Sequence, residues 1–89
     1  MIEQVDPKRY GLPPRTLLMK RGAQEFILVI RRKSRIIMKD ARAILKKAEK
    51  IQAKASNVSV SVETNAPVCG KSTQFLKDNG IVVKKHLKN

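Results

Sequence analysis

Basic side chains dominate the chemistry that this sequence offers. Twenty Lys and Arg residues stand against seven Asp and Glu in a chain of 89 residues, which gives a formal net charge of +13. A small domain usually carries a net charge of about 2–8 in magnitude, so this excess predicts attraction to a polyanion. The cations that we expect to bind it are Arg31, Arg32, Lys33, Arg35, Lys39, Arg42, Lys46 and Lys50.

These eight residues form two groups by spacing. The loop cluster, Arg31, Arg32, Lys33 and Arg35, follows an apolar run that has the length of a strand. The helical stripe, Lys39, Arg42, Lys46 and Lys50, repeats every three or four residues, which places its members on one side of an α-helix. Glu49 is the one carboxylate in the body of that helix, so ion pairing within the helix does not neutralise the stripe.

The function that this charge favours is non-catalytic binding of nucleic acid through its phosphates. Charged runs often do no more than solvate a helix, but solvation normally uses both signs. One Tyr and two Phe leave little capacity for base stacking, and phosphate contacts alone do not separate DNA from RNA. A protein partner with an acidic surface, or a second copy of the chain, stays open as an alternative.

A second candidate site is the turn formed by Cys69, Gly70, Lys71 and Ser72. It follows a predicted strand and opens a predicted helix, where unpaired backbone N–H groups favour an anion or a thiolate. The last three residues match the end of a Walker A motif, but Asn65 stands where its first glycine belongs, which argues against nucleotide hydrolysis. Phosphate binding and thiol chemistry remain. In the structural alternative, Cys69 is a small buried residue and Ser72 or Thr73 caps the helix.

The segment 58–83 resembles the active-site turn of monothiol glutaredoxins. The resemblance lies in Pro67-Val68-Cys69-Gly70-Lys71-Ser72, in Phe75-Leu76 and in Asn79-Gly80-Ile81. That family carries Cys-Gly-Phe-Ser on a strand-to-helix turn, and here Lys71 takes the place of the aromatic residue. The resemblance implies that Cys69 is a thiol of low pKa, with glutathione or an iron–sulfur cluster as its cofactor.

The elements that position both sites follow from periodicity. Apolar residues spaced by three and four predict a helix over 41–55, and alternation over 58–63 predicts a strand. Two apolar runs around Gly22 predict a hairpin of strands at 16–19 and 24–32, and the uninterrupted run 26–30 predicts burial on both faces. A second helix over 70–79 and a last strand over 81–83 complete the pattern.

We therefore expect an α/β fold, a small two-layer domain in residues 16–89. An N-terminal β-hairpin is followed by α-β-α-β, which gives a four-stranded mixed sheet with two helices. Residues 1–15 carry three prolines and are expected to form an extended arm, which Val5, Tyr10 and Leu12 can pin to the domain. Residues 84–89 form a basic tail that we expect to fray.

Composition also sets limits on the class of protein. No apolar run reaches the roughly 20 residues of a membrane span, and no signal peptide is visible, so we expect a cytoplasmic protein without a membrane partner. A single Cys and a single His supply neither a disulfide nor a four-ligand zinc site. We expect no cofactor and no metal.

Overall fold

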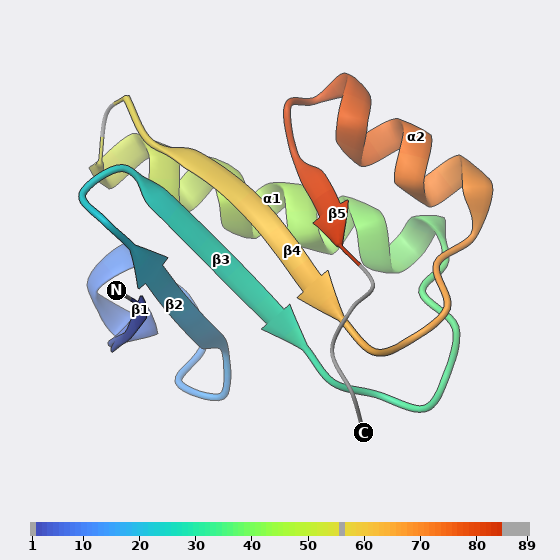
Figure 1. Ribbon diagram of the computed structural model, residues 1–89, viewed down its shortest axis with the longest axis horizontal. Coiled ribbons are helices and arrows are strands. Elements are labelled where there is room, and N and C mark those ends of the chain that lie inside the picture. The colour runs from blue at the N-terminus through green and yellow to red at the C-terminus, as the bar shows by residue number, and fades with distance from the viewer. Residues whose placement is uncertain (1, 56, 85–89) are drawn as a thin grey trace.

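The computed structural model describes residues 2–55 and 57–84, and the predicted tail at 85–89 lies outside this range. The described chain forms one five-stranded sheet with the strand order β1-β2-β3-β4-β5 (Figure 1). The helices and strands are β1 (Ile2–Val5), the 3₁₀ helix η1 (Pro7–Tyr10), β2 (Leu17–Arg21), β3 (Glu25–Ile30), α1 (Met38–Lys54), β4 (Ser59–Thr64), α2 (Gly70–Asp78) and β5 (Val82–Lys84).

The N-terminal half of the sheet is an antiparallel meander. The predicted hairpin is confirmed: β2 pairs with β3, and Gly22 adopts a positive φ of 66° in the turn between them. The expected count of four strands is wrong, because β1 pairs antiparallel with β2 and adds a fifth. All three prolines of the first fifteen residues lie after Val5, so they leave the backbone of β1 able to pair.

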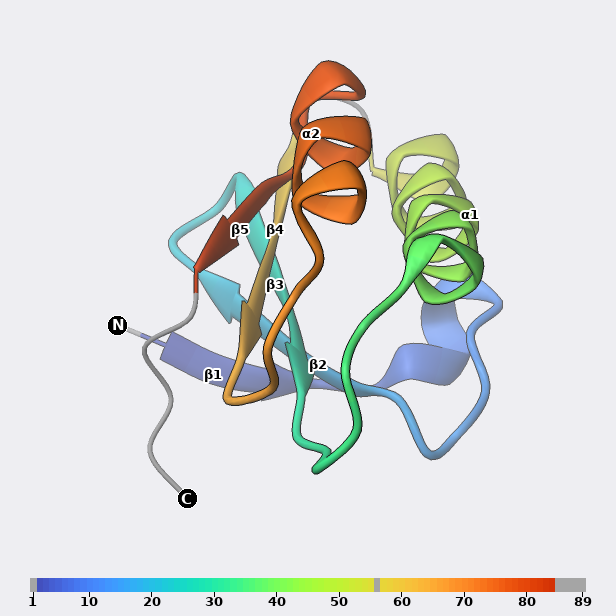
Figure 2. The same ribbon diagram turned by 90° about the vertical axis from the view of Figure 1, so that its right-hand side faces the viewer.

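The C-terminal half is built from two crossovers, as predicted. β3 runs parallel to β4 and β4 runs parallel to β5, with α1 and α2 as the connecting helices. Helix α1 starts one residue after Ile37 and buries Ala41, Ile44, Ala48 and Ile51, the face that its periodicity indicated. Both helices cover the same face of the sheet (Figure 2), so the domain has two layers.

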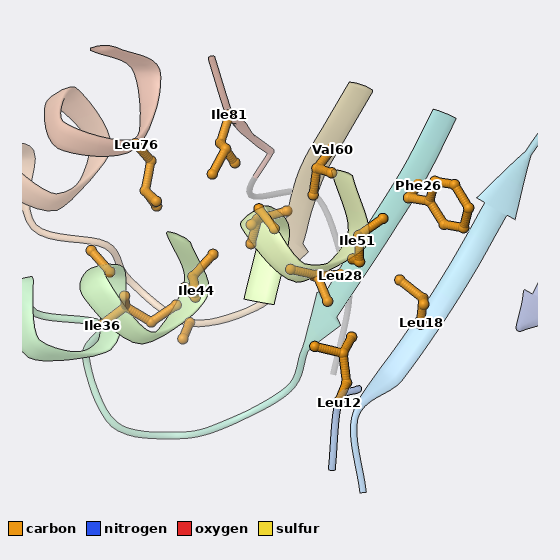
Figure 3. Close-up of a cluster of buried hydrophobic side chains, with 14 residues drawn as sticks. Leu12, Leu18, Phe26, Leu28, Ile36, Ile44, Ile51, Val60, Leu76 and Ile81 are labelled. Carbon is orange, nitrogen blue, oxygen red and sulfur yellow. The ribbon is translucent and has the colours of Figure 1, made fainter. Parts of the chain in front are cut away.

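The core fills the space between the helices and that face of the sheet (Figure 3). Alternate strand positions supply it, among them Leu18, Phe26 and Leu28, while Leu76 comes from α2. The predicted pinning of the first residues is confirmed, because Leu12 is buried in the core and Val5 and Tyr10 pack against it.

Strand β3 is buried on both faces in its middle, over residues 26–28. Phe26 and Leu28 point to the helices, whereas Ile27 points to the opposite face and is still only 1% exposed. No helix of the described chain lies on that second face, so neighbouring strand side chains shield Ile27. Val29 and Ile30 are half-buried, which limits the predicted two-sided burial to residues 26–28.

Candidate nucleic-acid interface

The helical stripe lies on the solvent face of α1. Lys39, Arg42, Lys46 and Lys50 are all exposed, and they lie opposite the buried residues of the same helix. At 1.5 Å per residue the stripe is about 16 Å long. Within residues 2–55 and 57–84 no ion pair involves these four side chains, and the Lys50 ammonium donates a long hydrogen bond of 3.4 Å to the Gly11 carbonyl. The structure therefore gathers the stripe on one face with its charge available.

The loop cluster lies between β3 and α1, and its members differ in their surroundings. Arg31, Lys33 and Arg35 are exposed. Arg32 is half-buried: its Nη1 lies 3.2 Å from Asp40 Oδ1, and its Nε donates to Ser34 Oγ at 3.0 Å. Three of the four cations are thus available to a ligand, while Arg32 is held by the first turn of α1.

Asp40 forms an ion pair with Arg32 that sequence reasoning did not anticipate. The Ile37 N–H donates to Asp40 Oδ2 at 3.0 Å, which satisfies an otherwise unpaired donor at the helix start. This hydrogen bond, followed by the hydrogen bond and charge of Arg32, holds the pKa of Asp40 below its usual range. The carboxylate is therefore ionised at neutral pH and neutralises one cation of the loop cluster.

The Cys69 turn has the predicted position after a strand and at the start of a helix. Cys69 is itself the N-cap of α2: the Ser72 N–H donates to Sγ at 3.3 Å, and Ser72 Oγ lies 2.8 Å from Sγ. These two contacts with Ser72 hold the pKa of Cys69 below its ordinary value, and the Arg35 charge adds to the effect. The alternative of a buried Cys69 with Ser72 or Thr73 as the helix cap is wrong. Ser72 is fully buried, and the half-buried Cys69 is the capping residue.

The two sites that the sequence presents separately are neighbours in the fold. The loops that lead into α1 and α2 pair through an isolated bridge between Ile36 and Val68. The Ile36 N–H donates to the Pro67 carbonyl at 2.9 Å, and the Cys69 N–H donates to the Ile36 carbonyl at 3.1 Å. Because β3 and β4 are adjacent and parallel, their carboxyl ends lie at the same edge of the sheet (Figure 1). The Cys69 turn therefore lies beside the loop cluster.

Sequence reasoning missed two cations that the fold brings to the same side of the molecule as the loop cluster. Arg15 precedes β2 and Lys47 lies on the flank of α1, and both line a groove together with Arg31. Arg15 belongs to the stretch expected to be an arm, and Lys47 lies outside the stripe by helical angle. Only the contact between α1 and the hairpin brings them together, and no spacing along the chain encodes it.

The described residues form neither a cluster of metal ligands nor a membrane-spanning helix. No three His, Cys, Asp or Glu side chains within residues 2–55 and 57–84 come together as metal ligands. Neither described helix combines the length and the apolar character that crossing a membrane requires.

Comparison with known proteins shows the fold and no family. No protein-family model matches the chain, and no curated protein matches its sequence. One solved structure is similar: the crystal structure of a repair endonuclease from Pyrococcus abyssi superposes with a TM-score of 0.63 at 7% sequence identity. The match covers 78% of this chain and 30% of the endonuclease chain. At this identity the likeness shows the arrangement of helices and strands alone.

Proposed function

We propose that this protein binds nucleic acid through phosphate contacts and carries out no chemistry on it. The observation that carries the proposal is the helical stripe, four exposed cations on one face of α1 without a described carboxylate partner. Duplex DNA carries one charge per about 1.7 Å of its axis, so a segment as long as the stripe presents about ten phosphates. Each cation of the stripe therefore has a phosphate within reach of its flexible side chain.

The aromatic residues support phosphate contacts over base stacking. Phe26 is buried, and the Tyr10 ring packs edge-on against it with a centroid distance of 5.2 Å. Phe75 packs against the core from α2. These are all the aromatic residues of the chain, and none of them is fully exposed, so they offer little surface on which an unpaired base could stack. This favours a duplex, whose bases are already stacked, over a single strand.

The experiment is fluorescence anisotropy with a labelled duplex over a series of salt concentrations. With roughly four to six phosphate contacts, log K should fall against log[salt] with a slope of about −4 to −5. The double variant Arg42→Glu/Lys46→Glu should bind every duplex sequence more weakly and reduce the slope by about two. Lys8→Glu/Lys77→Glu makes the same charge change at exposed positions of η1 and α2, outside the helical stripe and the loop cluster, and is the matched control.

Two results would contradict the proposal. A parent protein without salt-dependent binding to any nucleic acid would exclude the function. A folded Arg42→Glu/Lys46→Glu variant that binds as tightly as Lys8→Glu/Lys77→Glu would exclude the helical stripe as the contact surface, because general loss of positive charge would then explain the whole effect.

A second candidate function is thiol-based, and the surroundings of Cys69 favour it. Its sulfur accepts from the Ser72 N–H at a helix start and lies near Arg35, and both features stabilise a thiolate. Cys69→Ser separates the two functions: it abolishes any thiol exchange with glutathione and leaves phosphate contacts intact. Loss of duplex binding in Cys69→Ser would show that the two functions share one site.

A further inference from the structure

An open groove lies between α1, the carboxyl end of β3 and the loop that leads into β2. Its volume is about 330 Å³, which lies within the range of small-ligand sites. Its wall is aliphatic where the helix-facing side chains of Leu28 and Ile30 in β3 meet Ile44 of α1. Leu28 and Ile44 are buried at its base, and the half-buried Ile30 presents apolar surface to the groove.

The polar part of the groove is cationic. Arg15, Arg31 and Lys47 line it, and no Asp or Glu does. In residues 2–55 and 57–84 none of these three cations forms an ion pair. Two guanidinium groups and one ammonium match a doubly charged phosphate better than a carboxylate, since Arg binds phosphate oxygens in a bidentate manner.

We propose that this groove binds a phosphate monoester that carries a flat apolar group, the chemistry of a nucleoside monophosphate. The phosphate lies against Arg15, Arg31 and Lys47, and the base lies on the aliphatic wall. The ligand is a free mononucleotide or the 5′-terminal nucleotide of a strand, which share this chemistry. Arg15 and Lys47 belong to neither the loop cluster nor the helical stripe, so the site shares only Arg31 with the proposed duplex contacts.

An NMR titration of the isotope-labelled full chain with three probes tests the ligand class. Adenosine 5′-monophosphate should shift the amide signals of residues that line the groove, such as Thr16 and Val29. Inorganic phosphate should bind the same residues about tenfold or more weakly, because it leaves the aliphatic wall exposed to water. Adenosine should cause no shift at the same concentration. Equal affinity for phosphate and the nucleotide, or shifts confined to the outer face of α1, would overturn the proposal.

Variants separate the groove from the duplex surface. Arg15→Gln and Lys47→Gln should each weaken the nucleotide about tenfold, the usual effect of removing a charged hydrogen bond. Lys54→Gln removes the same charge from an exposed position of α1 that does not line the groove, and it should leave affinity unchanged. If all three variants weaken the nucleotide equally, the binding is general attraction to a basic surface and the groove is not the site.

The source of the nucleotide is resolved with short oligonucleotides. A 5′-phosphorylated strand that competes with adenosine 5′-monophosphate, where its 5′-hydroxyl counterpart does not, identifies a strand end as the ligand. Competition by neither identifies the free nucleotide. Duplex binding without nucleotide binding would defeat the groove alone, and nucleotide binding without salt-dependent duplex binding would defeat the proposed function alone.

Discussion

Replacing Asp40 perturbs both the stability of α1 and the charge of the loop cluster. Its carboxylate accepts from the Ile37 N–H at 3.0 Å, faces Arg32 at 3.2 Å and lies in the first turn of the helix. The capping hydrogen bond contributes about 1 kcal/mol, and the helix dipole and the partly exposed ion pair add a few tenths each. Asp40→Ala should therefore cost about 1.5 kcal/mol in urea melts, and Asp40→Asn, which keeps an acceptor, about 0.5 kcal/mol.

The pH dependence checks the mechanism behind these values. The Ile37 N–H and Arg32 hold the pKa of Asp40 below its unfolded value, so its contribution is fully present above that value. The contribution is lost as the pH falls below about 4 and through the lower folded pKa. The difference in unfolding free energy between the parent and Asp40→Asn should thus shrink in acid. A difference that is the same at neutral pH and at about pH 2 would refute the reasoning.

The same variant has an effect on binding. Asp40→Asn releases Arg32 from its carboxylate, so under the proposed function the slope of log K against log[salt] should steepen by about 0.9, one more phosphate contact. Glu49→Gln makes the same charge change at a carboxylate that forms no ion pair with the residues described, and its slope should stay that of the parent. Equal slopes for both variants would show that Arg32 does not reach a phosphate.

Two further predictions concern the core and the thiol. Leu28 is 2% exposed, and Leu28→Ala should lower the free energy of unfolding by about 2–5 kcal/mol. Ile2 is 50% exposed, and Ile2→Ala should lower it by less than about 0.5 kcal/mol. Equal values for the two variants would show that Leu28 is not part of the core. The rate of Cys69 alkylation against pH should have its midpoint below the ordinary value of about 8.5, and Ser72→Ala should move it upward because a hydrogen bond to the thiolate is lost. A midpoint at or above the ordinary value in the parent would contradict the capping geometry.

The parts of the fold that sequence predicted correctly are those with a strong local pattern. Helix α1 has seventeen residues with an apolar face, and the sequence of β4 alternates valine with serine and glutamate, so each carries its own evidence. Strand β1 has no such pattern, because Glu3 and Gln4 occupy half of it and its residues are largely exposed. Its conformation is set by hydrogen bonds to β2, and this pairing partner lies about fifteen residues away.

The candidate site divides in the same manner. The helical stripe follows from the 3.6-residue period, which holds inside one helix. The ion pair between Arg32 and Asp40 depends on the path of the loop between β3 and α1. The position of Arg35 near Cys69 and the groove around Arg15 depend on how segments from different strands meet. No residue type or spacing encodes these contacts, because they arise from the bridge between Ile36 and Val68 and from the packing of α1 on the hairpin.

The strand order of the sheet is the order of the strands along the chain, and this has a consequence for synthesis on the ribosome. Every strand after β1 finds its neighbour in the sheet already synthesised. A ribosome adds about 5–20 residues per second, while a hairpin forms in about 1–10 μs, so the β1-β2-β3 meander is complete long before β4 exists. Until α1 emerges, the nascent meander presents Leu18, Phe26 and Leu28 to water on one face. The next element to leave the exit tunnel is the helix that covers this face, so the interval in which a chaperone has apolar surface to bind is the time needed to translate residues 31–54.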